Sequence, residues 1–458
     1  MSTIASQPGA AELPHFFDFT PEAFGAWCES KRMPAFRVKQ VFEWVYQKGV
    51  VDPMVMTNLS ALDRRTLAEE MRFLTGDIVR RQEATDGTKK LLLAWNDGVA
   101  PGAGLQASEA EEKTLSLAVA GNVDDRKTTE CVMIPSEDRR TACISSQVGC
   151  PVGCKFCASG VGGLESNLTG GRIVEQVWRL REMLRTHAMN RLETGPILNG
   201  SETRQTPHRS EAGSTRGGRL PAAERRATQE EFPRITNVVF MGMGEPLSNF
   251  GPVMHAVKAI TSLWGHAISA RKVTISTVGL PKAIERLAAD CDVPVTLALS
   301  LHAPTDEIRR ELIPWAQYST IEQLLASCQK WFEKTGREIT LEYTLLRGVN
   351  DAPEHAHELA RLAKTLRANV NIIRYNEVAG MPFGRPETQV VHDFQQVLRA
   401  KGINSHIRAS RGRDIAAACG QLRYEERKKG EVGSGPAPSS VTRGKGAAAS
   451  RSAAVRGE

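Results

Sequence analysis

Apolar residues recur at helical spacing near the start of the chain. The segments PEAFGAWCESKRMPAFRVKQVFEWVYQKG and SALDRRTLAEEM place residues such as Val38, Val41 and Val45 on one side of a helix. This periodicity predicts a small helical domain over residues 20–75, preceded by a disordered N-terminus over residues 1–19.

Short apolar runs replace the helical pattern over residues 76–135. KKLLLAW, TLSLAVA and ECVMIP are separated by polar turns, which is typical of β-strands. We expect these strands to link the helical domain to the main domain.

From residue 136 onward, apolar strands alternate with amphipathic helices. The predicted strands are ACISSQ, NVVFMGMG, KVTISTVG, PVTLALSL, EITLEYTLL, NVNIIRYN and INSHIRAS, and helices such as IVEQVWRLREML, PVMHAVKAITSLW and IEQLLASCQKWFEK lie between them. This repetition predicts an α/β fold of βα units, with a parallel sheet or barrel, over residues 136–425. In such folds the chemistry takes place at the carboxyl ends of the strands.

Two segments do not continue this pattern. Residues 190–231 are rich in Gly, Ser, Thr, Pro, Arg and Glu, and residues 426–458 are rich in Gly, Ala and Ser. Neither has the apolar periodicity that a packed core requires. We expect a disordered insertion within the main domain and a disordered basic tail.

Composition narrows the class of protein but does not identify a partner. The 458 residues include 59 Lys and Arg against 52 Asp and Glu, and residues 421–458 alone hold eight Lys and Arg against four Glu. The net charge of +7 is therefore partly a property of the tail, and it permits RNA binding without establishing it. The chain starts without the features of a signal peptide and has no long apolar run, so we expect a cytoplasmic protein with no membrane partner. We also expect a monomer.

The cysteines suit a metal centre better than a disulfide framework. Of the nine, only Cys143, Cys150, Cys154 and Cys157 cluster in the sequence. The last three form a C-x-x-x-C-x-x-C set, which can hold three irons of a [4Fe–4S] cluster and leave the fourth iron open to the amino and carboxylate groups of S-adenosylmethionine (SAM). The alternative is a zinc-stabilised, non-enzymatic RNA-binding protein with Cys143 as the fourth ligand. Structural zinc usually draws on two close pairs, and no second pair exists here.

Other candidate site residues follow the predicted strands. The turn MGMGEPL places Gly244 and Glu245 where the backbone can approach a ligand closely. Cys419, within RGRDIAAACGQL, is on position alone best explained as a small buried apolar residue. The polar residues after the remaining strands are individually consistent with ordinary polar groups, but together they would line one face at the strand ends: Ser276, Ser300, His302 and Asn376.

Taken in order, five motifs resemble the RlmN family of radical-SAM RNA methyltransferases. They are PAFRVKQVFEWVY, CISSQVGCPVGCKFC, NVVFMGMGEPL, ALSLHAPTDEIR and RGRDIAAACGQL, and they extend over residues 34–422. The resemblance implies a radical-SAM partial (β/α)6 barrel with a small N-terminal helical domain that binds RNA. It also implies methylation of C2 of one adenine in 23S ribosomal RNA, at the peptidyl transferase centre, and of one in the tRNA anticodon loop. The implied cofactors are one [4Fe–4S] cluster and SAM, of which two molecules are consumed per methylation, with an electron donor such as flavodoxin.

The resemblance also assigns a role to Cys419 as an S-methylcysteine carrier. One SAM would methylate Cys419, and the radical derived from a second SAM would abstract hydrogen from that methyl group, so that the methylene radical adds to adenine C2. Release from the covalent protein–RNA intermediate would use Cys143, which forms a transient disulfide with Cys419, and Glu130, which matches the proton acceptor. Either Cys143 or Glu130 could remove the C2 proton. The residues matched to SAM binding are Gly244, Glu245, Ser276, Ser300, Leu301, His302 and Asn376.

The chain departs from the family pattern at two places. Leu164 and Ser166 stand where many members have an aromatic residue and an arginine, so a contact to RNA or cofactor is expected to be weaker there. The insertion over residues 190–231 is not part of the pattern. The motifs do not separate C2 methylation from C8 methylation of the same ribosomal adenine, which gives antibiotic resistance; the helical N-terminal segment favours C2.

Overall fold

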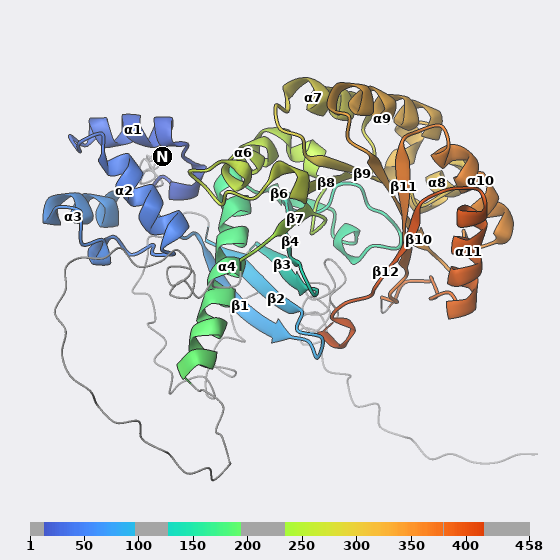
Figure 1. Ribbon diagram of the computed structural model, residues 1–458, viewed down its shortest axis with the longest axis horizontal. Coiled ribbons are helices and arrows are strands. Elements are labelled where there is room, and N and C mark those ends of the chain that lie inside the picture. The colour runs from blue at the N-terminus through green and yellow to red at the C-terminus, as the bar shows by residue number, and fades with distance from the viewer. Residues whose placement is uncertain (1–12, 97–126, 194–233, 379, 416–458) are drawn as a thin grey trace, which may run out of the picture.

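The computed structural model describes residues 13–96, 127–193, 234–378 and 380–415 (Figure 1). The N-terminal unit is helical. Its 3₁₀ turns η1 (Phe16–Asp18) and η3 (Pro53–Val55) accompany α1 (Pro21–Ser30), α2 (Arg37–Phe42), the π-helical turn η2 (Glu43–Gln47) and α3 (Ala61–Glu70). Thr20 and Ser60 begin α1 and α3, because each hydroxyl accepts a hydrogen bond from a backbone amide in the first turn, at 3.3 and 3.1 Å.

The expectation that residues 1–19 are disordered is wrong for residues 13–19. Phe16 and Phe17 are completely buried, and the Phe16 amide donates to the carbonyl of Arg72 at 2.8 Å. The centroid of the Phe16 ring lies within 5.5 Å of the ring centroids of Phe24, Phe42 and Phe73. The FFDF sequence thus completes an aromatic core that the helices alone would leave open.

One sheet organises the rest of the molecule. Its strand order is β1-β2-β3-β4-β7-β8-β9-β10-β11-β12, and β4 and β7 to β12 run parallel to one another. The predicted linking strands extend this sheet as an antiparallel edge, while TLSLAVA lies outside the described residues. The strands are β1 (Gly76–Glu83), β2 (Lys89–Trp95), β3 (Thr128–Pro135), β4 (Arg140–Cys143), β7 (Asn237–Phe240), β8 (Val273–Thr277), β9 (Thr296–Ser300), β10 (Ile339–Leu345), β11 (Ala368–Arg374) and β12 (Ser405–Arg408), with β5 (Gln147–Gly149) and β6 (Leu164–Asn167) forming a separate ribbon.

Helices cover one face of the sheet (Figure 1). They are α4 (Gly170–Glu193), α6 (Phe250–Thr261), α7 (Pro281–Asp290), α9 (Ile321–Thr335), α10 (Pro353–Ala363) and α11 (Thr388–Ala400). The short helix α8 (Asp306–Leu312) packs with the cysteine loop instead. The 3₁₀ turns are η4 (Ala158–Gly160), η5 (Pro246–Asn249), η6 (Ala270–Lys272), η7 (Pro314–Tyr318) and η8 (Arg413–Ile415). The predicted α/β fold of parallel strands and intervening helices, with a helical N-terminal unit, is confirmed. None of the described helices combines the length and the apolar character that crossing a membrane requires.

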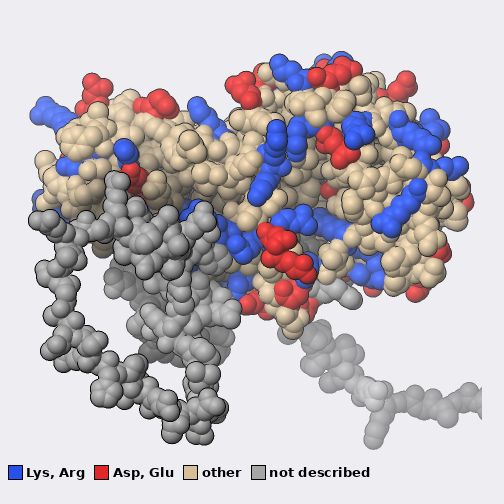
Figure 2. All heavy atoms as spheres, in the orientation of Figure 1, with Lys and Arg blue, Asp and Glu red and all other residues tan. Residues whose placement is uncertain are grey.

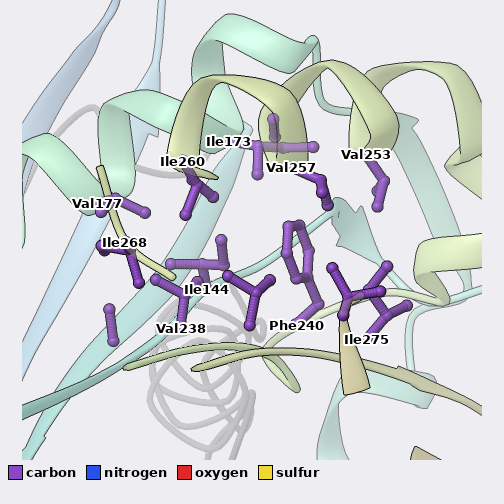
Figure 3. Packing of buried hydrophobic residues seen from close by; sticks show 14 of the residues in the cluster. Ile144, Ile173, Val177, Val238, Phe240, Val253, Val257, Ile260, Ile268 and Ile275 are labelled. Carbon is purple, nitrogen blue, oxygen red and sulfur yellow. The ribbon is translucent and has the colours of Figure 1, made fainter. Parts of the chain in front are cut away.

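The strands use their two faces differently. Side chains such as Phe240 and Ile275 point toward Val253 and Val257 of α6, and belong to the main hydrophobic core (Figure 3). Along each strand, the alternate residues point away from this core and are often polar. Ser276, which follows Ile275 on β8, is one of them and lines a cavity. This alternation places a polar surface on the face of the sheet that the helices do not cover.

Candidate active site

A cavity of about 310 Å³ lies on this polar face. Its wall is built from segments that are far apart in the sequence, mostly the loops at the carboxyl ends of the parallel strands. Nine of the residues singled out from the sequence line it: Cys150, Cys154, Cys157, Gly244, Glu245, Ser276, Ser300, His302 and Asn376.

The cysteine loop is fixed by its backbone. Gly149 and Gly153 have φ angles of 77° and 71°, a left-handed conformation that favours glycine. The amide of Cys150 donates to the carbonyl of Gly163 at 2.9 Å, and the amide of Cys157 donates to the carbonyl of Cys154 at 3.1 Å. The loop therefore presents its three thiols in one conformation.

The three thiols lie in apolar surroundings. Val152, Phe156 and Val278 are among the buried residues packed around them. Burial raises the pKa of the Cys150 thiol to about 12, and burial together with the neighbouring Cys157 and Cys150 raises the pKa of Cys154 well above its usual value. A bound cationic group is what would favour thiolates at such a place.

The donor set fits an iron–sulfur cluster better than zinc. Among the described residues, no group of three or more His, Cys, Asp or Glu side chains is arranged to hold a single metal ion. In a [4Fe–4S] cluster each thiolate binds a different iron, so three cysteines need not converge on one point, whereas structural zinc needs four converging ligands. Cys143, the fourth ligand of the zinc alternative, is not in the cavity wall formed by the described residues.

The MGMGE turn approaches the loop that follows β4. Gly242 donates its amide to the carbonyl of Ile144 at 3.0 Å, and a Cβ at this position would fall 2.6 Å from that same oxygen. Gly244 has a φ angle of 106°, and the next amide, that of Glu245, donates to Oε1 of Gln147 at 2.7 Å. Both glycines are therefore required by the geometry of the turn.

The Glu245 carboxylate is held in place at the cavity wall. Oε1 accepts from the amide of Leu247 at 3.0 Å, and Oε2 accepts from the amide of Val278 at 2.8 Å. Burial raises the pKa of Glu245 to about 6, although the hydrogen bonds from Val278, Thr277 and Leu247 oppose that shift. The carboxylate is thus an oriented acceptor that joins the ends of β7 and β8.

The polar groups on β8 and β9 form a compact set. The hydroxyls of Ser276 and Ser300 lie 3.2 Å apart. Nδ1 of His302 accepts from the amide of Thr344 at 3.1 Å, which leaves Nε2 to carry the proton of the neutral ring. Burial, together with the charge of Arg309, lowers the pKa of His302 to about 3, so this ring is neutral near pH 7. The side chain of Leu301 belongs instead to the hydrophobic core.

Sequence reasoning missed Arg309 and Glu342. Arg309 is 1% exposed; its Nε donates to the carbonyl of Leu301 at 3.2 Å, and its Nη2 donates to the carbonyl of Val278. Glu342 lines the cavity and accepts from Nδ2 of Asn371 at 2.8 Å, and burial raises its pKa. Apolar and polar residues alternate in EITLEYTLL, and this alternation could have placed Glu342 on the polar face of the strand, toward the cavity. No signal in DEIRREL distinguishes Arg309 from its exposed neighbour Arg310.

Among the described residues, those that the family resemblance assigns to methyl transfer do not line the cavity. Glu130 and Cys143, on the adjacent strands β3 and β4, are each 3% exposed. Cys419 lies outside the described residues, and no disulfide joins any two of the eight described cysteines. The segment that precedes Cys419 does reach the cavity, since Arg408 to Arg411 form part of its wall.

The turn between β1 and β2 contacts this C-terminal segment. The amide of Gly412 donates to Oδ2 of Asp86 at 2.9 Å, and the amide of Thr85 donates to Oδ2 of Asp414 at 2.8 Å. Two reciprocal backbone-to-carboxylate hydrogen bonds thus attach the C-terminal segment to the antiparallel edge of the sheet.

Leu164 and Ser166, where the chain departs from the family pattern, lie on β6. Leu164 is exposed, and β6 pairs with β5 outside the main sheet. The departure therefore concerns the exposed strand of a ribbon whose other strand, β5, is buried and leads into the cysteine loop.

Comparison with known proteins gives a consistent result. The family described as "Ribosomal RNA large subunit methyltransferase N-terminal domain" matches residues 15–72. The "Probable dual-specificity RNA methyltransferase RlmN" of Rhodopirellula baltica is 34% identical over 94% of this chain and 96% of its own length, and that of Thermosynechococcus vestitus is 38% identical over 88% and 96%. The crystal structure of a radical SAM methyltransferase from Sphaerobacter thermophilus is 34% identical, covers 89% of this chain and 98% of its own, and superposes with a TM-score of 0.70. The chain therefore belongs to the RlmN family of radical SAM RNA methyltransferases.

Proposed function

We propose that this enzyme methylates C2 of one adenine in 23S ribosomal RNA, at the peptidyl transferase centre, and of one adenine in the tRNA anticodon loop. The observation that carries the proposal is that three cysteines, the Gly-Glu turn and the polar ends of β8 and β9 converge on one cavity. Such convergence at strand ends is typical of a cofactor site in a barrel-like α/β fold.

The cofactor residues follow from the cavity wall. Cys150, Cys154 and Cys157 would hold a [4Fe–4S] cluster, which when bound supplies the electron for reductive cleavage of SAM. The Glu245 carboxylate, fixed by two backbone amides, would accept a hydrogen bond from the SAM ammonium group.

The remaining cavity residues would orient the nucleoside half of SAM. Ser276 and Ser300 present adjacent hydroxyls that suit a ribose, and Asn376 lines the same cavity. His302 stays neutral near pH 7, so it offers one N–H donor and no charge. Buried Val278 and Phe156 exclude water, which protects a reactive radical from side reactions.

A cysteine carrier suits the chemistry of the target atom. Adenine C2 is electron-poor and does not attack a sulfonium methyl group as an ordinary nucleophile would. Cys419 would accept the methyl group from one SAM by displacement, and hydrogen abstraction from that methyl group would give a carbon radical able to add to C2. Cys143 and Glu130, both buried on the adjacent strands β4 and β3, would then complete release.

RNA access is compatible with the charge of the surface. Figure 2 shows Lys and Arg interspersed with Asp and Glu over one face of the molecule rather than a surface of one sign. Specific recognition of an adenine would therefore depend on RNA shape and on exposure of the target base, as is usual for RNA enzymes.

The test is anaerobic reconstitution with 23S ribosomal RNA and tRNA, followed by nucleoside mass spectrometry and by assay of 5′-deoxyadenosine. Wild-type enzyme should give 2-methyladenosine in both RNAs. Cys419→Ala should still cleave SAM but methylate neither RNA, while Cys291→Ala, a matched control at the end of α7, should behave as wild type. Formation of 8-methyladenosine alone would instead establish the C8 activity, and methylation by Cys419→Ala would exclude the carrier.

A further inference from the structure

Lys90 is a buried lysine that the proposed chemistry has not used. Its side chain is 0% exposed, and its Nζ lies 3.8 Å from Oε1 of Glu130, which is 3% exposed. Lysine is rarely buried completely, because removing an ammonium group from water is costly unless a partner compensates. Lys90 and Glu130 therefore form a buried ion pair between the adjacent strands β2 and β3.

The pair lies on the cavity side of the sheet. Leu91 and Leu93 on β2, and Cys131 and Met133 on β3, belong to the core beneath the helices. Because side chains alternate along a strand, Lys90 and Glu130 point the opposite way. Ile134, on the same face of β3, lines the cavity.

The strand register brings this pair next to Cys143. Lys90 is directly opposite Val132, and Val132 is directly opposite Cys143, so the three form one row across β2, β3 and β4. Glu130 precedes Val132 by two residues and is therefore the diagonal neighbour of Cys143, at about 7–8 Å between backbones. A glutamate side chain can reach a thiol across that distance.

We propose that Lys90 is a positioning residue for the release step, which holds Glu130 as an oriented carboxylate base beside Cys143. The inference rests on the proposed function, in which Glu130 and Cys143 act on the covalent protein–RNA intermediate. An ammonium ion at this distance favours the carboxylate over the carboxylic acid, and only the carboxylate can accept a proton.

The step that Lys90 supports is nucleophilic. The step begins from the adduct that has already lost its C2 proton to solvent and its unpaired electron to a one-electron acceptor, so that the methylene carbon joins an aromatic C2 to the Cys419 sulfur. The Cys143 thiol then transfers its proton to Glu130, and its sulfur attacks the sulfur of Cys419. The S–S bond forms and the bond between the Cys419 sulfur and the methylene carbon breaks. The electron pair of that bond passes to the methylene carbon, which takes a proton to become the methyl group.

Lys90 would not be needed for the earlier steps. It is not in the cavity wall formed by the described residues, where SAM would bind. Removing its charge should therefore leave SAM cleavage and methylation of Cys419 in place while slowing release. A purely structural lysine would instead affect all of these steps together when it is replaced.

The experiment measures release relative to adduct formation in one sample. Lys90→Met, which removes the charge but keeps most of the length, is reconstituted anaerobically and mixed with substrate RNA. The covalent adduct is followed on denaturing gels, and methylated RNA by mass spectrometry. Because both signals come from folded enzyme, their ratio does not depend on how much of the variant folds. Lys90→Arg, Glu130→Gln and Cys143→Ala are measured alongside.

We expect Lys90→Met to accumulate the adduct, with release slowed at least about tenfold, and Lys90→Arg to restore most of the release rate. The double variant Lys90→Met/Glu130→Gln should release no more slowly than Glu130→Gln alone, because Lys90 acts through Glu130. An unchanged ratio in Lys90→Met, or full additivity in the double variant, would overturn the inference. If Cys143→Ala itself accumulates no adduct, the release chemistry of the proposed function fails instead.

Discussion

We predict that the Glu175 carboxylate stabilises the packing of the N-terminal helical unit against the main domain. Its carboxylate, on α4, is completely buried and accepts hydrogen bonds from the amide and hydroxyl of Thr75, both at 2.9 Å, and from the amide of Gly76 at 3.2 Å. Arg179 lies 2.7 Å away and His15 lies 3.3 Å away. One carboxylate thus joins α4, the start of β1 and the segment before α1.

The magnitude follows from the pKa of Glu175. Burial alone would raise this pKa, but the charge of Arg179, the hydrogen bond and charge of His15 and the amide of Thr75 outweigh burial and lower it from 4.5 to about 2. A shift of this size corresponds to about 3 kcal/mol of folding free energy. Because the folded-state pKa is the lower one, this stabilisation is complete above about pH 4.5 and is lost as the pH falls through about 2.

The assay is urea unfolding of Glu175→Gln followed by tryptophan fluorescence, at pH 7 and at lower pH. We expect a loss of about 3–5 kcal/mol at pH 7, because the amide cannot accept from all of these donors and leaves Arg179 without its charge partner. Glu182→Gln, further along α4 and partly exposed, should cost at most about 1 kcal/mol. If Glu175→Gln cost no more than Glu182→Gln, or if the difference from wild type grew at low pH, the reasoning would be refuted.

Three further predictions concern the site. Cys150→Ala should lose the brown colour and most of the bound iron after anaerobic reconstitution, as measured by visible absorbance, and an unchanged spectrum would contradict its role as a ligand. Gly242→Ala should abolish SAM binding measured by equilibrium dialysis, since its Cβ would fall 2.6 Å from the carbonyl of Ile144, whereas Gly251→Ala, with no heavy atom within 4 Å of its Cβ, should bind normally. Asp86→Ala should slow methylation of Cys419, measured by peptide mass spectrometry, because the C-terminal segment loses its hydrogen bond from Gly412; an unchanged rate would show that this contact does not position the segment.

The residues that line the cavity could be predicted from the sequence, whereas the residues that hold them in place could not. The cysteine spacing, the MGMGEPL turn and the polar residues after each strand are local patterns, and parallel strands bring their carboxyl ends together whatever the details of packing. For that reason Ser276 and Ser300, which are 24 residues apart, could be placed on one cavity wall without knowledge of the structure.

The residues that sequence reasoning missed depend on pairing across the fold. Arg309 has the pattern of an exposed helical arginine, and its burial follows from how α8 packs against the loops after β8 and β9. Lys90 lies in an apolar run that predicts a strand but not its register, and only the register places it beside Glu130. The burial of Phe16 depends on the rings of Phe42 and Phe73, which are distant in sequence, so no local pattern around Phe16 indicates that it is ordered.

The central claim is that the methyl group reaches adenine C2 through Cys419 and a carbon radical. The most direct measurement uses SAM with a fully deuterated methyl group and determines both the position and the deuterium content of the methyl group in the RNA. Hydrogen abstraction from the carrier removes one deuterium and a proton later replaces it, so we expect 2-methyladenosine with two deuterium atoms in its methyl group. A product that retains all three deuterium atoms, or one that is methylated only at C8, would contradict it.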